Sequence, residues 1–231
     1  METGYKLLIF DADNTLFDYD RAEGHALKMS LDAFAASWQS DYLELYRRIN
    51  SQGWKEYEQG RLSRDDLRVS RFKRFLKRVG ITVDPLEMSN RYLKELGNTG
   101  FLYPGARELL AELFAHHSLA LLTNGFSEVQ RARLSQSRLE AFFSSIVISE
   151  EVGMQKPDPE IFHLVLGNFA GVAANDALMI GDNLASDIKG GTDAGLHTCW
   201  YNPGQLEGEE EINPTYTVSD YGELRQVILS R

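Results

Sequence analysis

The chain has 231 residues, of which 43% are hydrophobic and 25% charged, and these proportions are typical of a globular protein with a full core. Its net charge of −10 argues against a general nucleic-acid or anionic-membrane surface. No apolar stretch approaches the ~20 residues of a membrane span, and the first residues do not resemble a secretion signal. The single cysteine, Cys199, cannot form an intramolecular disulfide, so we expect a soluble, cytoplasmic protein.

Short apolar runs predict five buried strands, at residues 6–10, 119–122, 145–148, 177–180 and 198–201. Helical patterns separate these runs: residues 105–116 precede the second run, 158–169 the fourth and 185–194 the fifth. Strands that alternate with helices predict an α/β fold with a doubly wound, Rossmann-like parallel sheet. In such sheets the functional side chains lie beyond the carboxyl ends of the strands.

Between residues 17 and 98 the pattern changes to successive helices. Ser63 is a typical N-cap and Gly80 a typical stop for one of them. This block predicts an all-helical cap domain at 17–98, inserted into a catalytic core formed by residues 1–16 and 99–231. Seven basic residues lie between positions 64 and 78, but the apolar stripe there predicts that they cover a solvated face and bind no nucleic acid.

The first two strands are each followed by residues suited to phosphate chemistry. Asp11 and Asp13 come directly after the first strand; an Asp-x-Asp pair alone is weak evidence, but its position at a strand end strengthens it. After the second strand come Thr123, Asn124 and Gly125. Such a turn can present a hydroxyl group and amide hydrogens to phosphate oxygens.

The third and fourth strands are followed by charged residues. Lys156 precedes Pro157 at the start of a helix, although a single lysine is usually solvated. Asp182 ends the fourth strand and Asp187 lies in the next turn, where acids also occur simply because a helix N-terminus attracts them. Each motif alone has an ordinary explanation, whereas the four together are specific.

The order and local context of the four motifs resemble those of the haloacid dehalogenase superfamily of phosphotransferases. The helical insertion after the first motif is similar to the type 1 cap of that family. Residues 54–60, 148–153 and 195–200 further resemble the YjjG-type pyrimidine 5′-nucleotidases, which dephosphorylate nucleoside monophosphates.

This resemblance implies a phosphatase that works through an aspartyl-phosphate. Asp11 would be the nucleophile, while Asp13 would protonate the departing oxygen and then deprotonate the attacking water. The implied cofactor is Mg²⁺, bound by the carboxylates of Asp11 and Asp182 and by the main-chain carbonyl of Asp13. Asp187 would lie near these ligands and orient them without binding the metal.

The resemblance also implies how the phosphoryl group is held. Thr123 and the main-chain amide of Asn124 would bind its oxygens, and Lys156 would balance the charge between nucleophile and phosphoryl group. The implied partner is a small phosphorylated substrate such as a nucleoside monophosphate. Whether the protein is a monomer or a homodimer stays open.

Several alternatives remain open at this stage. Sugar-phosphate phosphatases and phosphomutases keep both aspartates, so the motifs do not separate them from nucleotidases. A 2-haloacid dehalogenase is less favoured because such enzymes lack an acid at the position of Asp13. A non-catalytic phosphate-binding protein predicts the loss of a motif residue, and none is lost.

Four aromatic residues are candidates for substrate specificity: Phe17 and Tyr19 near the predicted hinge, and Trp54 and Tyr57 in the cap. Packing inside the cap is the favoured explanation for Trp54 and Tyr57, which lie three residues apart on a helix. Charge divides unevenly, because residues 17–98 carry +2 and the remainder −12. An anionic substrate would therefore require a metal ion at the acidic site.

Overall fold

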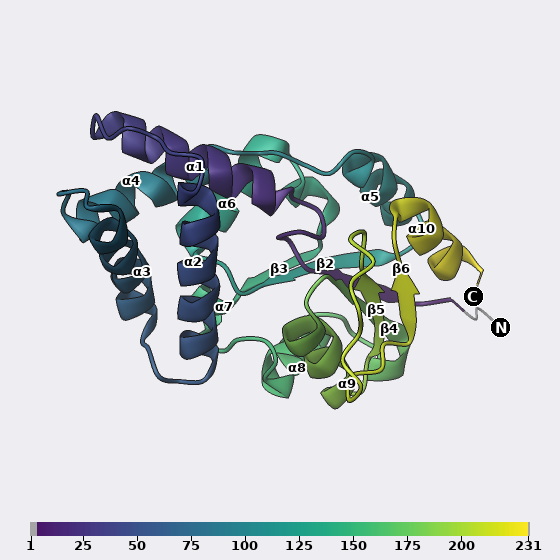
Figure 1. Cartoon of the computed structure of the whole chain (residues 1–231). Helices are drawn as coiled ribbons and strands as arrows, with labels where there is room; N and C mark the ends of the chain where they lie inside the picture. The colour runs from purple at the N-terminus through teal and green to yellow at the C-terminus, as the bar shows by residue number, and fades with distance from the viewer. Residues whose placement is uncertain (1–3, 231) are drawn as a thin grey trace. The chain divides into compact units, whose positions relative to one another are not determined.

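The computed structural model describes residues 4–230 and divides into two compact units (Figure 1). One unit combines the segment that ends at Tyr19 with the segment that begins at Gly100, and the other is Asp20–Thr99. The main chain of Phe17, the first residue of the predicted insertion, forms bridges to Asp13 and Leu102. These bridges tie the start of the insertion to the first unit.

A six-stranded parallel sheet forms the centre of the first unit, in the order β3-β2-β1-β4-β5-β6 (Figure 1). The strands are β1 (Leu7–Phe10), β2 (Ser118–Thr123), β3 (Ser145–Ile148), β4 (Ala177–Gly181), β5 (His197–Tyr201) and β6 (Tyr216–Val218). The α/β fold class and the first five strands are confirmed. Strand β6, three residues long at the sheet edge, is not among the predicted strands.

The central strand β1 is buried on both faces, which explains its unbroken apolar sequence. Leu8 and Phe10 join one hydrophobic core, while Leu7 and Ile9 join a second core on the opposite face. Phe10 is in register with Leu121 of β2 and with Ile180 of β4. The carboxyl ends of these three strands therefore lie at one edge of the sheet.

Helices cover both faces of the sheet. The Leu8 face packs against α5 (Ala106–Phe114), α6 (Ser127–Ser137) and α10 (Tyr221–Leu229), and the Leu7 face packs against α8 (Pro159–Gly167). Shorter turns complete this unit: η1 (Glu140–Phe142), α7 (Ser149–Val152), η2 (Ala174–Asp176), η3 (Leu184–Lys189) and α9 (Gly190–Asp193). The single helix predicted at 185–194 is instead a π-helical turn, η3, followed by α9.

The second unit is helical. Its helices are α1 (Tyr19–Ala33, whose first residue belongs to the other unit), α2 (Tyr42–Glu58), α3 (Arg64–Val79) and α4 (Pro85–Gly97). Tyr46 of α2 stacks on Phe72 of α3 at 5.2 Å between ring centroids, and Tyr92 of α4 packs against both rings. None of the helices within residues 4–230 has the length and apolar character needed to cross a bilayer.

The burial of Arg71, on α3, contradicts one expectation from the sequence. Its side chain is buried and donates to Asn50 Oδ1 at 2.9 Å, and Asn50 Nδ2 donates in turn to Glu23 Oε1 at 3.0 Å. The prediction that the basic residues of this stretch cover a solvated face is therefore wrong for Arg71. Asn50 of α2 pairs with this buried guanidinium, which also lies over the rings of Phe72 and Tyr92 at 5.2 and 5.3 Å from their centroids.

Helix α3 begins and ends as predicted, and its N-cap allows a test. Ser63 Oγ accepts from the Asp66 main-chain amide at 3.0 Å, and Gly80 adopts φ of 68° at the other end. Ser63→Ala should lower the free energy of unfolding of the cap unit by about 1 kcal/mol, because the amide loses its acceptor. Urea denaturation measures this change. The control is Ser51→Ala, at an exposed position inside α2, and equal stability of the two variants would contradict the prediction.

Candidate active site

Lys156 joins three segments that are far apart in the sequence. Its buried ammonium donates to Asp11 Oδ1 at 2.5 Å, to Asp187 Oδ1 at 2.6 Å and to the Leu122 carbonyl at 3.0 Å. An ammonium group has three hydrogens, so these acceptors use its full donor capacity. The loop after α7, the end of β1, strand β2 and the turn η3 are thereby held together.

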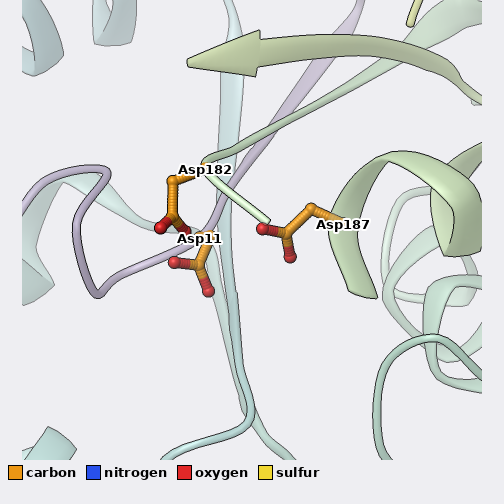
Figure 2. Close-up of side chains that lie close together, drawn as sticks. All are labelled: Asp11, Asp182 and Asp187. Carbon is orange, nitrogen blue, oxygen red and sulfur yellow. The ribbon is translucent and has the colours of Figure 1, made fainter. Parts of the chain in front are cut away.

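Three carboxylates gather beside this ammonium group (Figure 2). Asp11 follows β1, Asp182 follows β4, and Asp187 comes from η3; each offers an oxygen within 4.8 Å of the others. Figure 2 shows that the three side chains project toward a common space. Oxygen donors in such a cluster suit a hard divalent cation.

Burial is the largest single influence on the pKa of Asp11, of Asp182 and of Lys156. It raises the pKa of Asp11 to about 7; Lys156 opposes this shift, whereas Asp187 and Asp13 add to it. Burial, followed by the charges of Asp11 and Asp187, also raises the pKa of Asp182. Burial lowers the pKa of Lys156, but Asp11 and Asp187 outweigh it and raise this pKa overall. Ionisation of all three carboxylates would exceed the charge that one ammonium group neutralises.

The position of Asp187 depends on a glycine at the end of β4. Asp187 Oδ2 accepts from the Asn183 amide at 3.1 Å, and its side chain lies directly against Gly181. A Cβ atom on Gly181 would lie 2.2 Å from Asp187 Oδ2. The neighbouring Asp182 is held through its carbonyl, which accepts from the indole of Trp200 at 2.8 Å.

Asn124 fixes the main chain of Lys156 by a two-point hydrogen bond. Its Nδ2 donates to the Lys156 carbonyl at 2.8 Å, and its Oδ1 accepts from the Lys156 amide at 2.9 Å. The adjacent Thr123 is buried, and its Oγ1 accepts from the Gly125 amide at 3.3 Å. That contact leaves the hydroxyl hydrogen of Thr123 available as a donor.

Asp13 lies outside the three-carboxylate cluster. Its two oxygens instead accept hydrogen bonds from Gln130 and Arg133, both on α6. Sequence reasoning missed these two residues and the side-chain role of Asn124. A weak signal existed, since Gln130 and Arg133 are three residues apart and therefore share a helix face with each other.

The four aromatic candidates lie in different environments. Phe17 is fully buried in the core, with the Arg133 guanidinium 4.2 Å above its ring, while Tyr19 is half-buried at the start of α1. Trp54 and Tyr57 are half-buried on α2 with ring centroids 5.8 Å apart, and the Tyr57 hydroxyl accepts from Arg64. Substrate contact by any of them stays a prediction.

The family model for haloacid dehalogenase-like hydrolases matches residues 5–195, which include every motif of the site. The chain belongs to this family. The resemblance inferred from the four motifs is thus confirmed.

Three known relatives align with nearly the whole length of this chain. The pyrimidine 5′-nucleotidase PynA of Streptococcus pneumoniae is 37% identical, over 95% of this chain and 93% of its own. The pyrimidine 5′-nucleotidase YjjG of Escherichia coli is 35% identical, over 96% of both chains. The HAD-hydrolase YfnB of Bacillus subtilis is 36% identical; its magnesium-bound crystal structure has a TM-score of 0.93 and covers 98% of this chain and 99% of its own.

The Gly181 packing generates a test of the site geometry. Gly181→Ala should displace Asp187 and break its contact with Lys156, because no Cβ fits beside the carboxylate. We expect a loss of about 1–3 kcal/mol in stability, measured by thermal unfolding, and a moved Asp187 in a crystal structure.

Gly167→Ala on α8 is the matched control, because nothing lies within 4 Å of its added methyl group. An unmoved Asp187 in Gly181→Ala, with stability equal to that of the control, would contradict the assignment of this packing.

Proposed function

We propose that this protein is a Mg²⁺-dependent phosphomonoesterase that hydrolyses nucleoside 5′-monophosphates, with pyrimidine nucleotides preferred. The observation that carries the proposal is the Lys156 ammonium bound between Asp11 and Asp187, with Asp182 completing the acidic cluster. This arrangement brings together a carboxylate suited to act as a nucleophile, a buried ammonium group and oxygens suited to bind a metal ion, and it supports the proposal. Phosphoryl transfer depends on such positioning and charge neutralisation.

Asp11 is the nucleophile in this proposal. Lys156 binds its Oδ1, which orients the carboxylate and leaves Oδ2 to attack phosphorus. The bond from Oδ2 to phosphorus forms as the ester bond to the ribose oxygen breaks, giving an aspartyl-phosphate. Two displacements with lower barriers replace one difficult attack by water.

Asp13 moves protons in both displacements. It gives a proton to the departing ribose oxygen, so that the nucleoside leaves as a neutral alcohol. It then takes a proton from the water that attacks phosphorus, while the bond from Asp11 to phosphorus breaks and phosphate leaves. Asp13 regains its starting protonation, and the cycle consumes only water and the ester.

Thr123 and Asn124 would hold the phosphoryl oxygens. The Thr123 hydroxyl hydrogen is available, and the Asn124 amide lies in the same turn at the end of β2. The Asn124 side chain meanwhile keeps Lys156 in place through its two hydrogen bonds. Binding of the phosphoryl group and orientation of the nucleophile are thus linked by one residue.

The residues of the cluster fit Mg²⁺. The cation would be bound by Asp11, Asp182 and the main-chain carbonyl of Asp13. Asp187, already bound to Lys156 and the Asn183 main-chain amide, would support these ligands without binding the cation itself. When bound, the cation supplies positive charge that offsets the carboxylates and the phosphoryl oxygens. The feature that supports this cation is the group of carboxylates around Asp11, whose pKa is raised first by burial and further by Asp187 and Asp13.

The preference for pyrimidine nucleotides rests on the relatives. PynA and YjjG are pyrimidine 5′-nucleotidases, and each aligns with more than nine-tenths of this chain. We further propose a cytoplasmic location, because nucleoside monophosphates are intracellular metabolites and the one cysteine, Cys199, is a buried thiol.

A phosphate-release screen with Mg²⁺ tests the function. We expect pyrimidine 5′-monophosphates to be the best substrates among nucleotides and sugar phosphates. A clear preference for sugar phosphates, or isomerisation of a hexose phosphate, would overturn the nucleotidase assignment. Release of halide from a 2-haloacid without Mg²⁺ would overturn the phosphatase assignment itself.

Asp11→Asn should reduce turnover in this screen by at least about 10⁴-fold, because the amide cannot form the aspartyl-phosphate. Circular dichroism and thermal unfolding check that the variant is folded. Phosphatase activity near that of the wild type in Asp11→Asn would contradict the mechanism.

The raised pKa of Asp11 predicts how metal binding depends on pH. Asp11 binds a proton below pH 7 in the metal-free protein, so the cation must displace this proton at pH 6 but not at pH 8. We expect Mg²⁺ affinity to be on the order of tenfold weaker at pH 6 than at pH 8. Calorimetry in buffers of different ionisation enthalpy should also detect proton release on binding near pH 6. Equal affinity at both pH values would contradict this coupling.

A further inference from the structure

Two buried polar side chains of α6 converge on Asp13. Gln130 Nε2 donates to Asp13 Oδ2 at 2.8 Å, and Arg133 Nη1 donates to Asp13 Oδ1. Gln130 is 1% exposed and Arg133 is fully buried, whereas the Asp13 side chain is 29% exposed. The mechanism above gives no role to either residue of α6.

Packing alone does not explain an arginine and a glutamine at these positions. Burying a guanidinium and an amide is costly unless specific partners satisfy them, and apolar residues would fill the same space without that cost. The Arg133 guanidinium also lies 4.2 Å above the centre of the Phe17 ring. Its plane is therefore fixed by an aromatic face as well as by the carboxylate.

The packing of Gln130 against Gly125 is an independent observation on the position of the Gln130 side chain. A Cβ atom there would lie 2.3 Å from Gln130 Nε2 and 2.9 Å from Gln130 Cγ. Gly125 does not have a positive φ, so its backbone conformation is open to other residues. The glycine is required for space, and the space is occupied by the side chain that reaches Asp13.

We propose that Gln130 and Arg133 are positioning residues that clamp both carboxylate oxygens of Asp13 for proton transfer. The inference rests on the proposed function, in which Asp13 serves the leaving oxygen and the attacking water. A partly exposed carboxylate otherwise rotates among several orientations, whereas proton transfer requires a heavy-atom distance of about 2.6–3.2 Å. Each clamped oxygen keeps a second lone pair, which can carry the transferred proton.

Two esters with different leaving groups test the clamp. Uridine 5′-monophosphate releases an alkoxide that needs a proton, whereas p-nitrophenyl phosphate releases a stable anion that does not. Since kcat/KM covers only the steps through the first ester cleavage, the ratio of the two kcat/KM values isolates proton donation. Gln130→Ala and Arg133→Lys should lower kcat/KM for the nucleotide about 10- to 100-fold, and that for the nitrophenyl ester less than about threefold.

Gly125→Ala extends the test by a double-mutant cycle. Alone, it should displace Gln130 and produce the same selective loss on the nucleotide. Added to Gln130→Ala it should cause no further loss of the ratio, because the clash has been removed. The control is Arg131→Met on the same helix, whose exposed side chain binds Glu151, and its ratio should equal that of the wild type.

Each other result overturns the clamp. Equal losses of kcat/KM on both esters would mean a structural role only, and unchanged kcat/KM values on both esters in all variants would mean that Asp13 needs no positioning. A crystal structure of Gln130→Ala in which Asp13 keeps its orientation would also overturn it, without reference to activity. A wild-type protein that hydrolyses neither ester would instead overturn the proposed function.

Discussion

The Lys156 ammonium binds acceptors from three separate segments, Asp11, Leu122 and Asp187, and the rest of the site depends on this convergence. A buried ammonium without acceptors would be strongly unfavourable, as would two adjacent carboxylates without a counter-ion. Each group therefore stabilises the burial of the others. One lysine does not neutralise three ionised carboxylates, so ionisation of all three would leave an excess of negative charge that a cation could balance.

The sheet was largely predictable because its strands are buried on both faces. In a globular protein, a short unbroken apolar run such as Leu7–Phe10 is typical of a strand that is buried on both faces. Strand β6 escaped prediction because three residues, Tyr216–Val218, are too short to carry a periodic signal. The π-helical turn η3 and the burial of Arg71 were also missed, because both depend on contacts formed after folding rather than on local pattern.

The candidate site was predictable in composition but not in its internal connections. Asp11 and Asp182 directly follow strands, Thr123 ends one, and Lys156 lies in the loop beyond β3 and α7, so the parallel topology brings all four to one edge of the sheet. The hydrogen bonds that orient them join positions such as Asn124 and Lys156, or Asp13 and Arg133, which are remote in sequence. A single sequence contains no local signal for such pairings, and only the folded arrangement reveals them.

The pairing of the two chain segments at the base of the cap has an evolutionary consequence. The Asp18 amide donates to the Phe101 carbonyl at 3.0 Å, and Phe17 forms a bridge to Leu102, so the insertion leaves and re-enters the core at adjacent points. For a loop whose ends are already held together, doubling the inserted length costs only about 0.6 kcal/mol in closure entropy. The first unit can thus accept inserts of different size with little loss of stability, while the side chains at its strand ends stay unchanged.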